Sequence, residues 1–370
     1  MTPRQTLGLW TLLCLAITWS SLDAEDLKTG VTSFSRVDAD FQIQGEYAGS
    51  VVLDGYCRSI GLQVAARGDG KFDALIDRGG LPGNGFDGST RLKLSGSRTG
   101  ENVVLGGDNL VVSLQSGYAA VVKSAAGQQV GWLQKMTRTS PTVGAPAPAN
   151  AIVLFDGHNT DRLKNAKVTS DGLLEVGCET KDSFQNFTLH AEFRIPYMPY
   201  AKGQARGNSG FYLQKRYEVQ VLDSFGLDPQ FNDCGSLYRF KAPDLNMSFP
   251  PLSWQTYDIN FCAPKFDSSG QRIAKGRITV RHNGVPIHNQ LELENKTGGG
   301  SVEGPNPLPI VFQNHNNPVH FRNIWLVDND RPNCLSPAYP GLLASSCQTP
   351  CQVEVRRHVL RHGLLGRRDR

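Results

Sequence analysis

The stretch Phe187-Thr-Leu-His-Ala-Glu-Phe-Arg-Ile195 alternates apolar and polar residues without a break. Successive side chains of a β-strand point to opposite faces, so Phe187 and Ile195 belong to one face and Glu192 and Arg194 to the other. Tyr217-Glu-Val-Gln-Val-Leu-Asp223 repeats this pattern and sets Glu218 and Gln220 opposite two valines. Both stretches therefore predict strands with one buried face and one polar face.

The same pattern continues on both sides of these strands. Turn-forming residues are frequent, with 39 Gly and 21 Pro in 370 residues, and they separate short apolar runs. The pair Asn283-Gly284 lies between two such runs and indicates a β-hairpin. Further strands are expected at 254–261, 276–283, 285–289, 308–313 and 319–327. An all-β fold follows, with an antiparallel jelly-roll sandwich as its architecture.

A second strand-rich region precedes this one. Alternating runs predict strands at 41–44, 62–65, 71–76, 91–94, 109–114 and 129–133, which suits a smaller β-sandwich or barrel. A Pro/Ala-rich stretch then marks a boundary, because it favours extended polyproline geometry. The predicted organisation is a signal peptide at 1–24, a small β-rich domain at 25–138, a linker at 139–150, a jelly roll at 151–330 and a Cys-containing basic tail at 331–370.

The chain ends carry the remaining compositional features. Arg4, an apolar run and a small-residue exit at Ala24 predict a secretory signal, and hence a secreted or periplasmic protein without a transmembrane segment. The formal charge of +4 is matched by the tail, where six arginines face two acidic residues between positions 353 and 370. The rest of the chain is nearly neutral, which argues against nucleic acid as a partner.

Cysteines agree with an oxidising compartment. Without Cys14 of the signal segment, seven remain, so at least one thiol is expected to be unpaired. Three of them, Cys334, Cys347 and Cys351, are expected to form a disulfide staple, since the C-x-x-C spacing of a zinc site is missing.

The polar faces of the predicted strands carry Glu, Gln and Arg where a solvated face usually carries Lys, Thr and Ser. Carboxylates and amides hydrogen-bond vicinal hydroxyls, Arg makes forked contacts, and aromatic rings stack on the apolar side of a sugar. Cross-strand ion pairs on a solvated sheet are the competing interpretation. Signatures of metalloproteases, serine esterases and P-loop enzymes are absent from the sequence.

Several blocks together resemble one family. They are Leu154-Phe-Asp-Gly157, 187–194, Arg206-Gly-Asn-Ser-Gly-Phe-Tyr212, 217–223, Trp254-Gln-Thr-Tyr-Asp258 and Phe312-Gln-Asn-His-Asn-Asn-Pro-Val-His-Phe-Arg-Asn-Ile-Trp325. In this order they resemble the 3-keto-disaccharide hydrolase domain, a concanavalin A-like jelly roll of bacterial secreted proteins. The resemblance implies cleavage of a glycosidic bond in a sugar oxidised at C3. In the last block the family pattern has Asp and Gly where this chain has Asn314 and Asn316.

The chemistry implied by this resemblance requires a base, an acid and a group that stabilises an enolate. The base is predicted to be Glu218 or His315, and the acid Glu192 or Asp223. Substrate-binding roles are predicted for Arg194, Asn208, Gln220, Tyr238, Gln313 and Arg322. No cofactor is certain, although a divalent metal ion held by Glu and His could stabilise the enolate. The alternative function is a non-catalytic, lectin-like carbohydrate-binding module.

Overall fold

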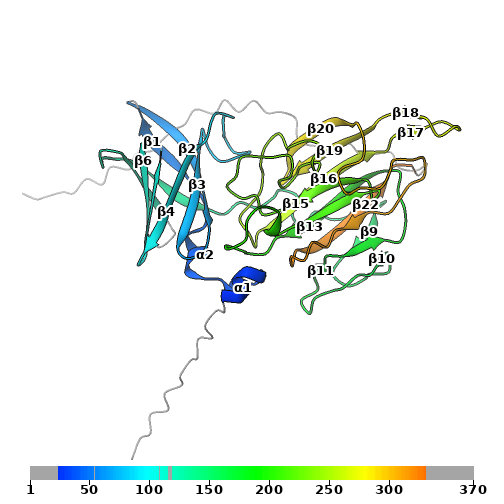
Figure 1. The fold of residues 1–370 in the computed structure, drawn as a ribbon, viewed down its shortest axis with the longest axis horizontal. Helices are drawn as coiled ribbons and strands as arrows, with labels where there is room; N and C mark the ends of the chain where they lie inside the picture. Colours follow the sequence, from blue (N-terminus) through cyan, green and yellow to red (C-terminus); the bar gives the residue numbers. More distant parts are fainter. Residues whose placement is uncertain (1–23, 54, 108, 116–118, 331–370) are drawn as a thin grey trace, which may run out of the picture. The chain divides into compact units, whose positions relative to one another are not determined.

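The computed structural model describes residues 24–330, except 54, 108 and 116–118 (Figure 1). These residues belong to one compact unit, Met1–Cys334, whereas the second unit, Leu335–Arg370, lies outside them. The predicted signal peptide, the cysteine staple and the basic tail therefore fall outside the described residues. No helix in the described part is long and apolar enough to cross a membrane.

Three short helical elements open the described chain: α1 (Ala24–Thr29), η1 (Phe34–Arg36) and α2 (Ala39–Ile43). The strand predicted at 41–44 is wrong, because α2 occupies most of it. The Asp38 carboxylate accepts a hydrogen bond from the Phe41 N–H at 3.0 Å and so caps the helix. An apolar–polar alternation over only four residues is a weaker determinant of local structure than this helix cap.

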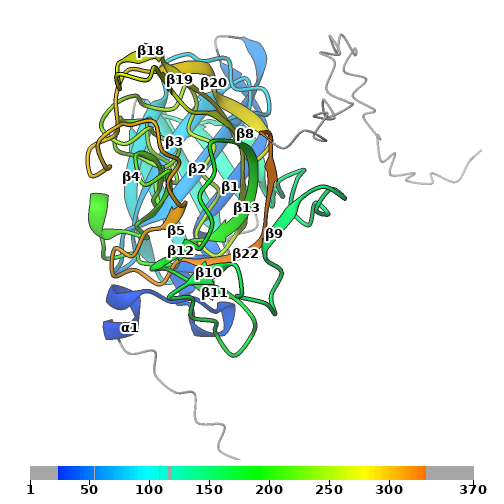
Figure 2. The same ribbon diagram turned by 90° about the vertical axis from the view of Figure 1, so that its right-hand side faces the viewer.

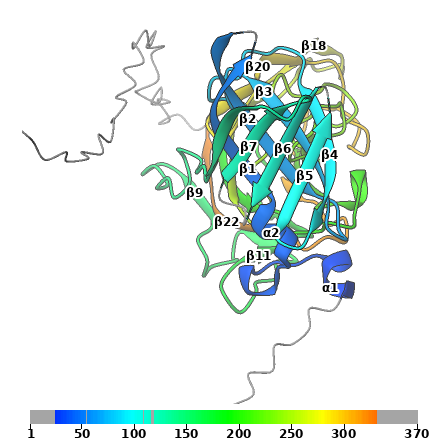
Figure 3. The same cartoon turned by 90° about the vertical axis from the view of Figure 1, so that its left-hand side faces the viewer.

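A closed antiparallel barrel follows, and Figure 3 shows its strands side by side. Its strands are β1 (Gly45–Leu53), β2 (Tyr56–Ala66), β3 (Lys71–Arg78), β4 (Leu92–Thr99), β5 (Asn102–Gly107), β6 (Leu110–Gln115), β7 (Ala119–Ser124) and β8 (Gln129–Met136). Each strand pairs with its sequence neighbour, and β8 closes the ring against β1. Buried apolar side chains such as Leu62, Val64 and Val112 form its core. The sequence predicted a small β-sandwich or a barrel, and the structure contains the barrel.

The jelly roll that follows contains two facing sheets. Its elements are β9 (Ile152–Phe155), β10 (Leu163–Lys164), β11 (Leu174–Glu175), β12 (Cys178–Thr180), β13 (Asn186–Arg194), η2 (Gly203–Ala205), β14 (Ser209–Leu213), β15 (Tyr217–Val221), β16 (Trp254–Cys262), β17 (Lys265–Phe266), β18 (Arg272–Ala274), β19 (Gly276–His282), β20 (Val285–Leu293), β21 (Val311–Phe312) and β22 (His320–Asp328). The larger sheet has the order β11-β22-β13-β16-β19-β20, with β9 beside β22 (Figure 2). The smaller sheet has the order β10-β12-β21-β14-β15, and β17 and β18 form a separate ribbon.

Several predicted features of this region are confirmed. The predicted hairpin connects β19 to β20, and Asn283 and Gly284 both adopt positive φ, at 50° and 80°. Positive φ at both central residues is what a type I′ turn requires. The all-β jelly-roll sandwich predicted from alternation is thus the observed architecture.

The core of the jelly roll lies between the two sheets and is rich in aromatic rings. The ring centroids of Phe193 and Phe211 are 6.4 Å apart, and those of Tyr217 and Phe261 are 5.5 Å apart. Each of these pairs joins one sheet to the other. Because side chains alternate along a strand, the polar residues of β13 and of β15 point away from this core, on opposite faces of the sandwich.

Candidate functional site

The outer face of the smaller sheet gathers one group of the predicted site residues. Tyr212 of β14 lies directly opposite Glu218 of β15, and Gly210 lies opposite Gln220. Gln313 follows β21 on the other side of β14. These five residues are called the Glu218 cluster below. The side chains of the cluster lie on the outer face of the smaller sheet, because the residues that alternate with them along each strand point into the core.

Glu218 is the buried carboxyl at the centre of the cluster, with 2% of its surface exposed. The Tyr212 phenol lies beside it, since the two residues are paired across β14 and β15. In the orientation that satisfies its amide, Gln220 places its nitrogen 3.1 Å from Glu218 Oε1 and 2.8 Å from the Ser209 carbonyl oxygen. Burial raises the pKa of Glu218 to about 7, and the neighbouring Tyr212 phenol, which favours the charged form, offsets only part of this shift.

Two acceptor atoms of the cluster are buried without a partner. Among the described residues, neither Glu218 Oε2 nor Gln313 Oε1 has a hydrogen-bond donor. Leaving such an atom unsatisfied costs about 1–3 kcal/mol, and sites that do so are often functional. A ligand that presents hydroxyl groups would supply the missing donors.

Gly210 forms the floor on which these two side chains converge. A Cβ atom at this position would lie 2.6 Å from Glu218 Oε1 and 3.2 Å from Gln313 Oε1. The Glu218 carboxyl therefore occupies the space that any larger residue at 210 would fill. The Asn208-Ser-Gly210 segment, which also fits a turn in the sequence, continues here into a strand.

We expect Gly210→Ala to displace the Glu218 carboxyl without unfolding the domain. The clash at 2.6 Å involves the end of a flexible side chain, which can rotate away. The melting temperature should stay within a few degrees, while any turnover that depends on Glu218 should fall at least about tenfold, since misplacement of about 1 Å can cost 10²-fold. Calorimetry and steady-state kinetics on the same sample check both parts, and unchanged turnover would contradict this role of Gly210.

The other predicted residues near this face occupy its surroundings. Asn208 is buried and donates to the Gln204 carbonyl oxygen at 2.7 Å. Tyr238 is half-buried, and a Cβ at Gly298 would lie 3.4 Å from its ring. His315 is exposed in the loop after Gln313.

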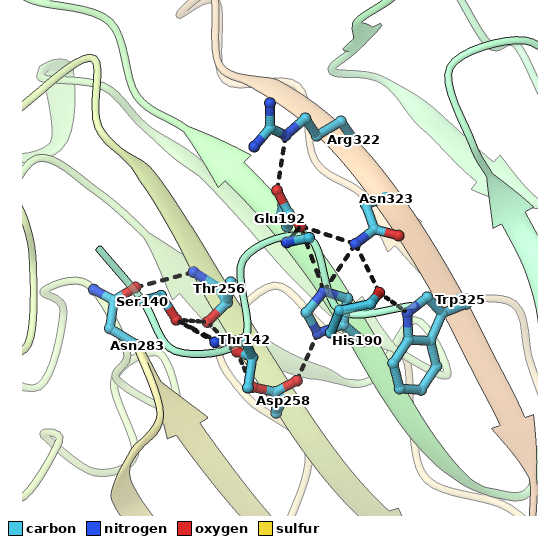
Figure 4. A network of polar contacts seen from close by, with 12 residues as sticks. Ser140, Thr142, His190, Glu192, Thr256, Asp258, Asn283, Arg322, Asn323 and Trp325 are labelled. Atoms are coloured by element: carbon cyan, nitrogen blue, oxygen red, sulfur yellow. Dashed lines mark hydrogen bonds and ion pairs between the residues drawn. The ribbon is translucent and has the colours of Figure 1, made fainter. Parts of the chain in front are cut away.

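A second group of predicted residues lies on the outer face of the larger sheet, shown in Figure 4. Glu192 accepts hydrogen bonds from Arg322 Nε at 2.7 Å, Asn323 Nδ2 at 2.8 Å and the Gly144 N–H at 2.5 Å. Burial by itself would raise the pKa of Glu192, but the hydrogen bonds from His190, Asn323, Gly144 and Arg322 outweigh it and hold the pKa at about 2. Glu192 is therefore a fully engaged carboxylate.

His190 links Glu192 to a second carboxylate. Its Nδ1 lies 2.6 Å from Asp258 Oδ1, and its Nε2 lies 3.8 Å from Glu192 Oε1. Burial lowers the pKa of His190, yet hydrogen bonds to Asp258 and Glu192 raise it further than burial lowers it. The raised pKa of His190 follows from its place between two carboxylates, Asp258 and Glu192.

The segment 140–145 covers this network. Thr142 Oγ1 donates to Asp258 Oδ2 at 2.7 Å, and the Ser140 and Thr256 hydroxyls are 2.6 Å apart. The Ala145 carbonyl oxygen accepts from Trp325 Nε1 at 3.3 Å. The stretch predicted as a linker thus makes specific hydrogen bonds to the larger sheet, while the proposed domain boundaries remain predictions.

Arg194 and Arg322 lie beside this network. Their guanidinium carbons are 4.9 Å and 3.9 Å from the centroid of the Trp254 ring, within the range of a cation–π contact. They share neither sheet nor face with the Glu218 cluster. The structure thus separates these two predicted binding residues from Glu218.

Asp223, the other predicted acid, lies just beyond the end of β15. Its Oδ2 is 2.5 Å from Arg206 Nε, and both side chains are buried. Its Oδ1 accepts from the Phe225 N–H at 3.3 Å. Asp223 is thus engaged in an ion pair and a turn.

Sequence reasoning assigned no catalytic role to two members of the cluster or to one residue beside it. Tyr212 and Gly210 were quoted as part of the block 206–212. Thr297, whose hydroxyl lies 2.8 Å from the Glu218 backbone nitrogen, was not expected at all. The run Gly298-Gly-Gly300 was the available signal, because such a run allows close approach of a backbone to neighbouring side chains.

The described residues contain no group of three or more His, Cys, Asp or Glu side chains arranged to hold a metal ion. In this part of the chain, the Glu and His side chains that were predicted to hold a metal ion do not come together in a binding site.

Comparison with known proteins identifies the domain that contains the Glu218 cluster. A family model described as the 3-keto-alpha-glucoside-1,2-lyase-like domain matches residues 150–327. The chain belongs to this family. The match to the 3-keto-alpha-glucoside-1,2-lyase-like domain includes both sheets of the jelly roll and leaves the barrel outside. A search of curated proteins found no match.

Solved structures that are similar to this chain include two from Parabacteroides distasonis. One, described as a "putative glycosyl hydrolase", is 33% identical, with 49% of this chain and 85% of that chain covered and a TM-score of 0.46. A second with the same description is 19% identical, with 49% and 94% covered and a TM-score of 0.35.

Proposed function

We propose that the jelly-roll domain cleaves the glycosidic bond of a sugar oxidised at C3, with Glu218 as the general base. The observation that carries this proposal is a buried carboxyl whose pKa is raised to about 7 and whose Oε2 has no donor among the described residues. Membership of the 3-keto-alpha-glucoside-1,2-lyase-like family supports it.

The chemistry follows from the C3 ketone. This ketone acidifies the C2 hydrogen, so Glu218 can remove it and leave an enolate. The enolate then expels the oxygen at C1, the C1–O bond breaks and a C1=C2 double bond forms. Water can add across this bond afterwards, which would complete a net hydrolysis. A base with a pKa near 7 suits this step at neutral pH.

The neighbours of Glu218 suit substrate binding. Gln313 Oε1 can accept a hydrogen bond from a sugar hydroxyl, and Gln220 can hold the carboxyl of Glu218 in place. The half-buried ring of Tyr238 offers an apolar surface of the kind on which a pyranose stacks. Residues 1–24 support export, so we place this reaction in the periplasm or outside the cell.

The test uses the full chain without its signal segment. It is incubated with p-nitrophenyl 3-keto-glucoside and with the unoxidised parent, with and without a chelator, and release of nitrophenol is followed. Release from the keto sugar alone supports the proposal, and loss of release with chelator would add a metal ion. Glu292→Gln, at a half-buried carboxylate of β20 that is ion-paired with Arg277, is the matched control for Glu218→Gln. No release from either sugar, together with measurable sugar binding, would favour the lectin-like alternative.

A further inference from the structure

The proposed elimination leaves one requirement open, because the departing C1 oxygen needs a proton. Both predicted acids are engaged elsewhere. Glu192 lies on the opposite face of the sandwich, bound to Arg322 and Asn323. Asp223 is ion-paired with Arg206. A proton donor for the leaving oxygen must therefore come from the surroundings of Glu218.

Tyr212 has the right position. It lies directly opposite Glu218 across the β14–β15 pair, on the same outer face of the sheet, and its phenol lowers the pKa of the Glu218 carboxyl. A Cβ at Gly299 would lie 2.8 Å from the Tyr212 phenol oxygen, so a glycine at 299 leaves the room that this oxygen occupies. Tyr212 is half-buried, so its ring is accessible from outside.

Other hydroxyl and acidic groups around Glu218 are less suited. The Thr297 hydroxyl donates to the Arg216 carbonyl oxygen at 3.1 Å and accepts from the Glu218 backbone N–H. Gln220 and Gln313 carry amides, which are not acids at neutral pH. His315 is exposed in the loop beyond Gln313.

We propose that Tyr212 is the catalytic acid that protonates the leaving oxygen while Glu218 takes the C2 proton. This inference rests on the function proposed above. The C2–H proton passes to the Glu218 carboxylate, the C1–O bond breaks, and the Tyr212 proton forms the new O–H bond of the released alcohol. Glu218 then returns its proton to the tyrosinate, so both groups regain their starting forms. The net change is loss of an alcohol from C1 and C2, with no other reactant.

Protonation of the leaving oxygen matters only when that oxygen is a poor leaving group, and this provides the test. Steady-state kcat/KM is measured for Tyr212→Phe with p-nitrophenyl and with methyl 3-keto-glucosides. We expect a loss of less than about tenfold with the nitrophenyl substrate and of about 10²–10⁴-fold with the methyl substrate, since a general acid contributes 10²–10⁴. An equal loss on both substrates would indicate a structural role, and no loss on either would remove Tyr212 from the reaction.

A second variant guards against a folding defect in the first. Gly299→Ala pushes the phenol oxygen instead of removing it, so it should show the same dependence on the leaving group. Tyr200→Phe, a half-buried phenol whose hydroxyl donates to Asp69 at 3.0 Å, is the control and should change kcat/KM for both substrates by less than about threefold. If the unmodified protein cleaves neither substrate, the function proposed above fails; if it cleaves both and the two variants show no preference, only the role of Tyr212 fails.

Discussion

Glu218→Gln is expected to abolish turnover and, at pH 8, to make the protein more stable. The carboxyl has a pKa of about 7 in the folded protein against 4.5 as its ordinary value. Between these two pH values the unfolded chain has lost the proton and the folded chain keeps it, so stability falls as pH rises. Above pH 7 the shift corresponds to roughly 3 kcal/mol of lost stability. Glutamine carries no charge and escapes this loss.

The measurement is urea unfolding at pH 4.5 and pH 8, together with kcat on a 3-keto-glucoside. We expect a gain of roughly 2–3 kcal/mol at pH 8, little gain at pH 4.5 and a loss of at least about 10³-fold in kcat. Glu292→Gln should change kcat little and stability by at most about 1 kcal/mol, because the ion pairs of Glu292 with Arg277 and Lys275 are largely solvent-exposed. A Glu218→Gln protein that is less stable at pH 8 would show that the carboxyl has a structural role.

The same carboxyl predicts the pH dependence of the reaction. A base must be deprotonated to act, so kcat/KM should rise with pH through about 7 and level off above it. A pH–rate profile from pH 5 to 9 checks this rise. A profile that is flat across this range would assign the base to another group.

Glu192→Ala is expected to destabilise the protein by about 3–5 kcal/mol, because it removes the buried carboxylate that pairs with Arg322 and lies beside His190. The pKa of Glu192 is about 2, below its ordinary value of 4.5, and this shift also predicts that loss of Glu192 destabilises the protein. A lowered pKa stabilises the fold above pH 4.5, and this contribution is lost as pH falls through 2. Urea unfolding at pH 7 measures the effect.

The folded fraction of Glu192→Ala should retain kcat within a few-fold, because Glu192 and Glu218 point away from the core on opposite faces. Kinetics below the unfolding midpoint and the control Glu292→Gln complete the experiment. Loss of kcat in a variant with wild-type stability would restore Glu192 as an acid and would place the reaction on the larger sheet.

Alternation along the chain predicted the all-β class and most of the long jelly-roll strands, but it missed β1, β5 and β7 and placed a strand where α2 lies. It was not sufficient to assign strands to sheets, because β13 and β15 have the same pattern and differ only in which partners they pair with. Glu192 and Glu218 therefore appeared as members of one site, although the fold separates them. Their environments also differ in ways that only tertiary structure reveals: Arg322 reaches Glu192 from another strand, whereas Gly210 gives Glu218 space.

The place of β22 in the larger sheet affects how the protein is made. This strand is the last of the domain, yet it pairs with β9, β11 and β13, which come first. At a synthesis rate of about 5–20 residues per second, roughly 6–25 s pass between the synthesis of β13 and that of its partner β22. During that time an apolar strand with an open edge is exposed to other chains. We expect the nascent chain to depend on chaperones until the segment 320–328 has emerged, and a chain truncated before it to aggregate.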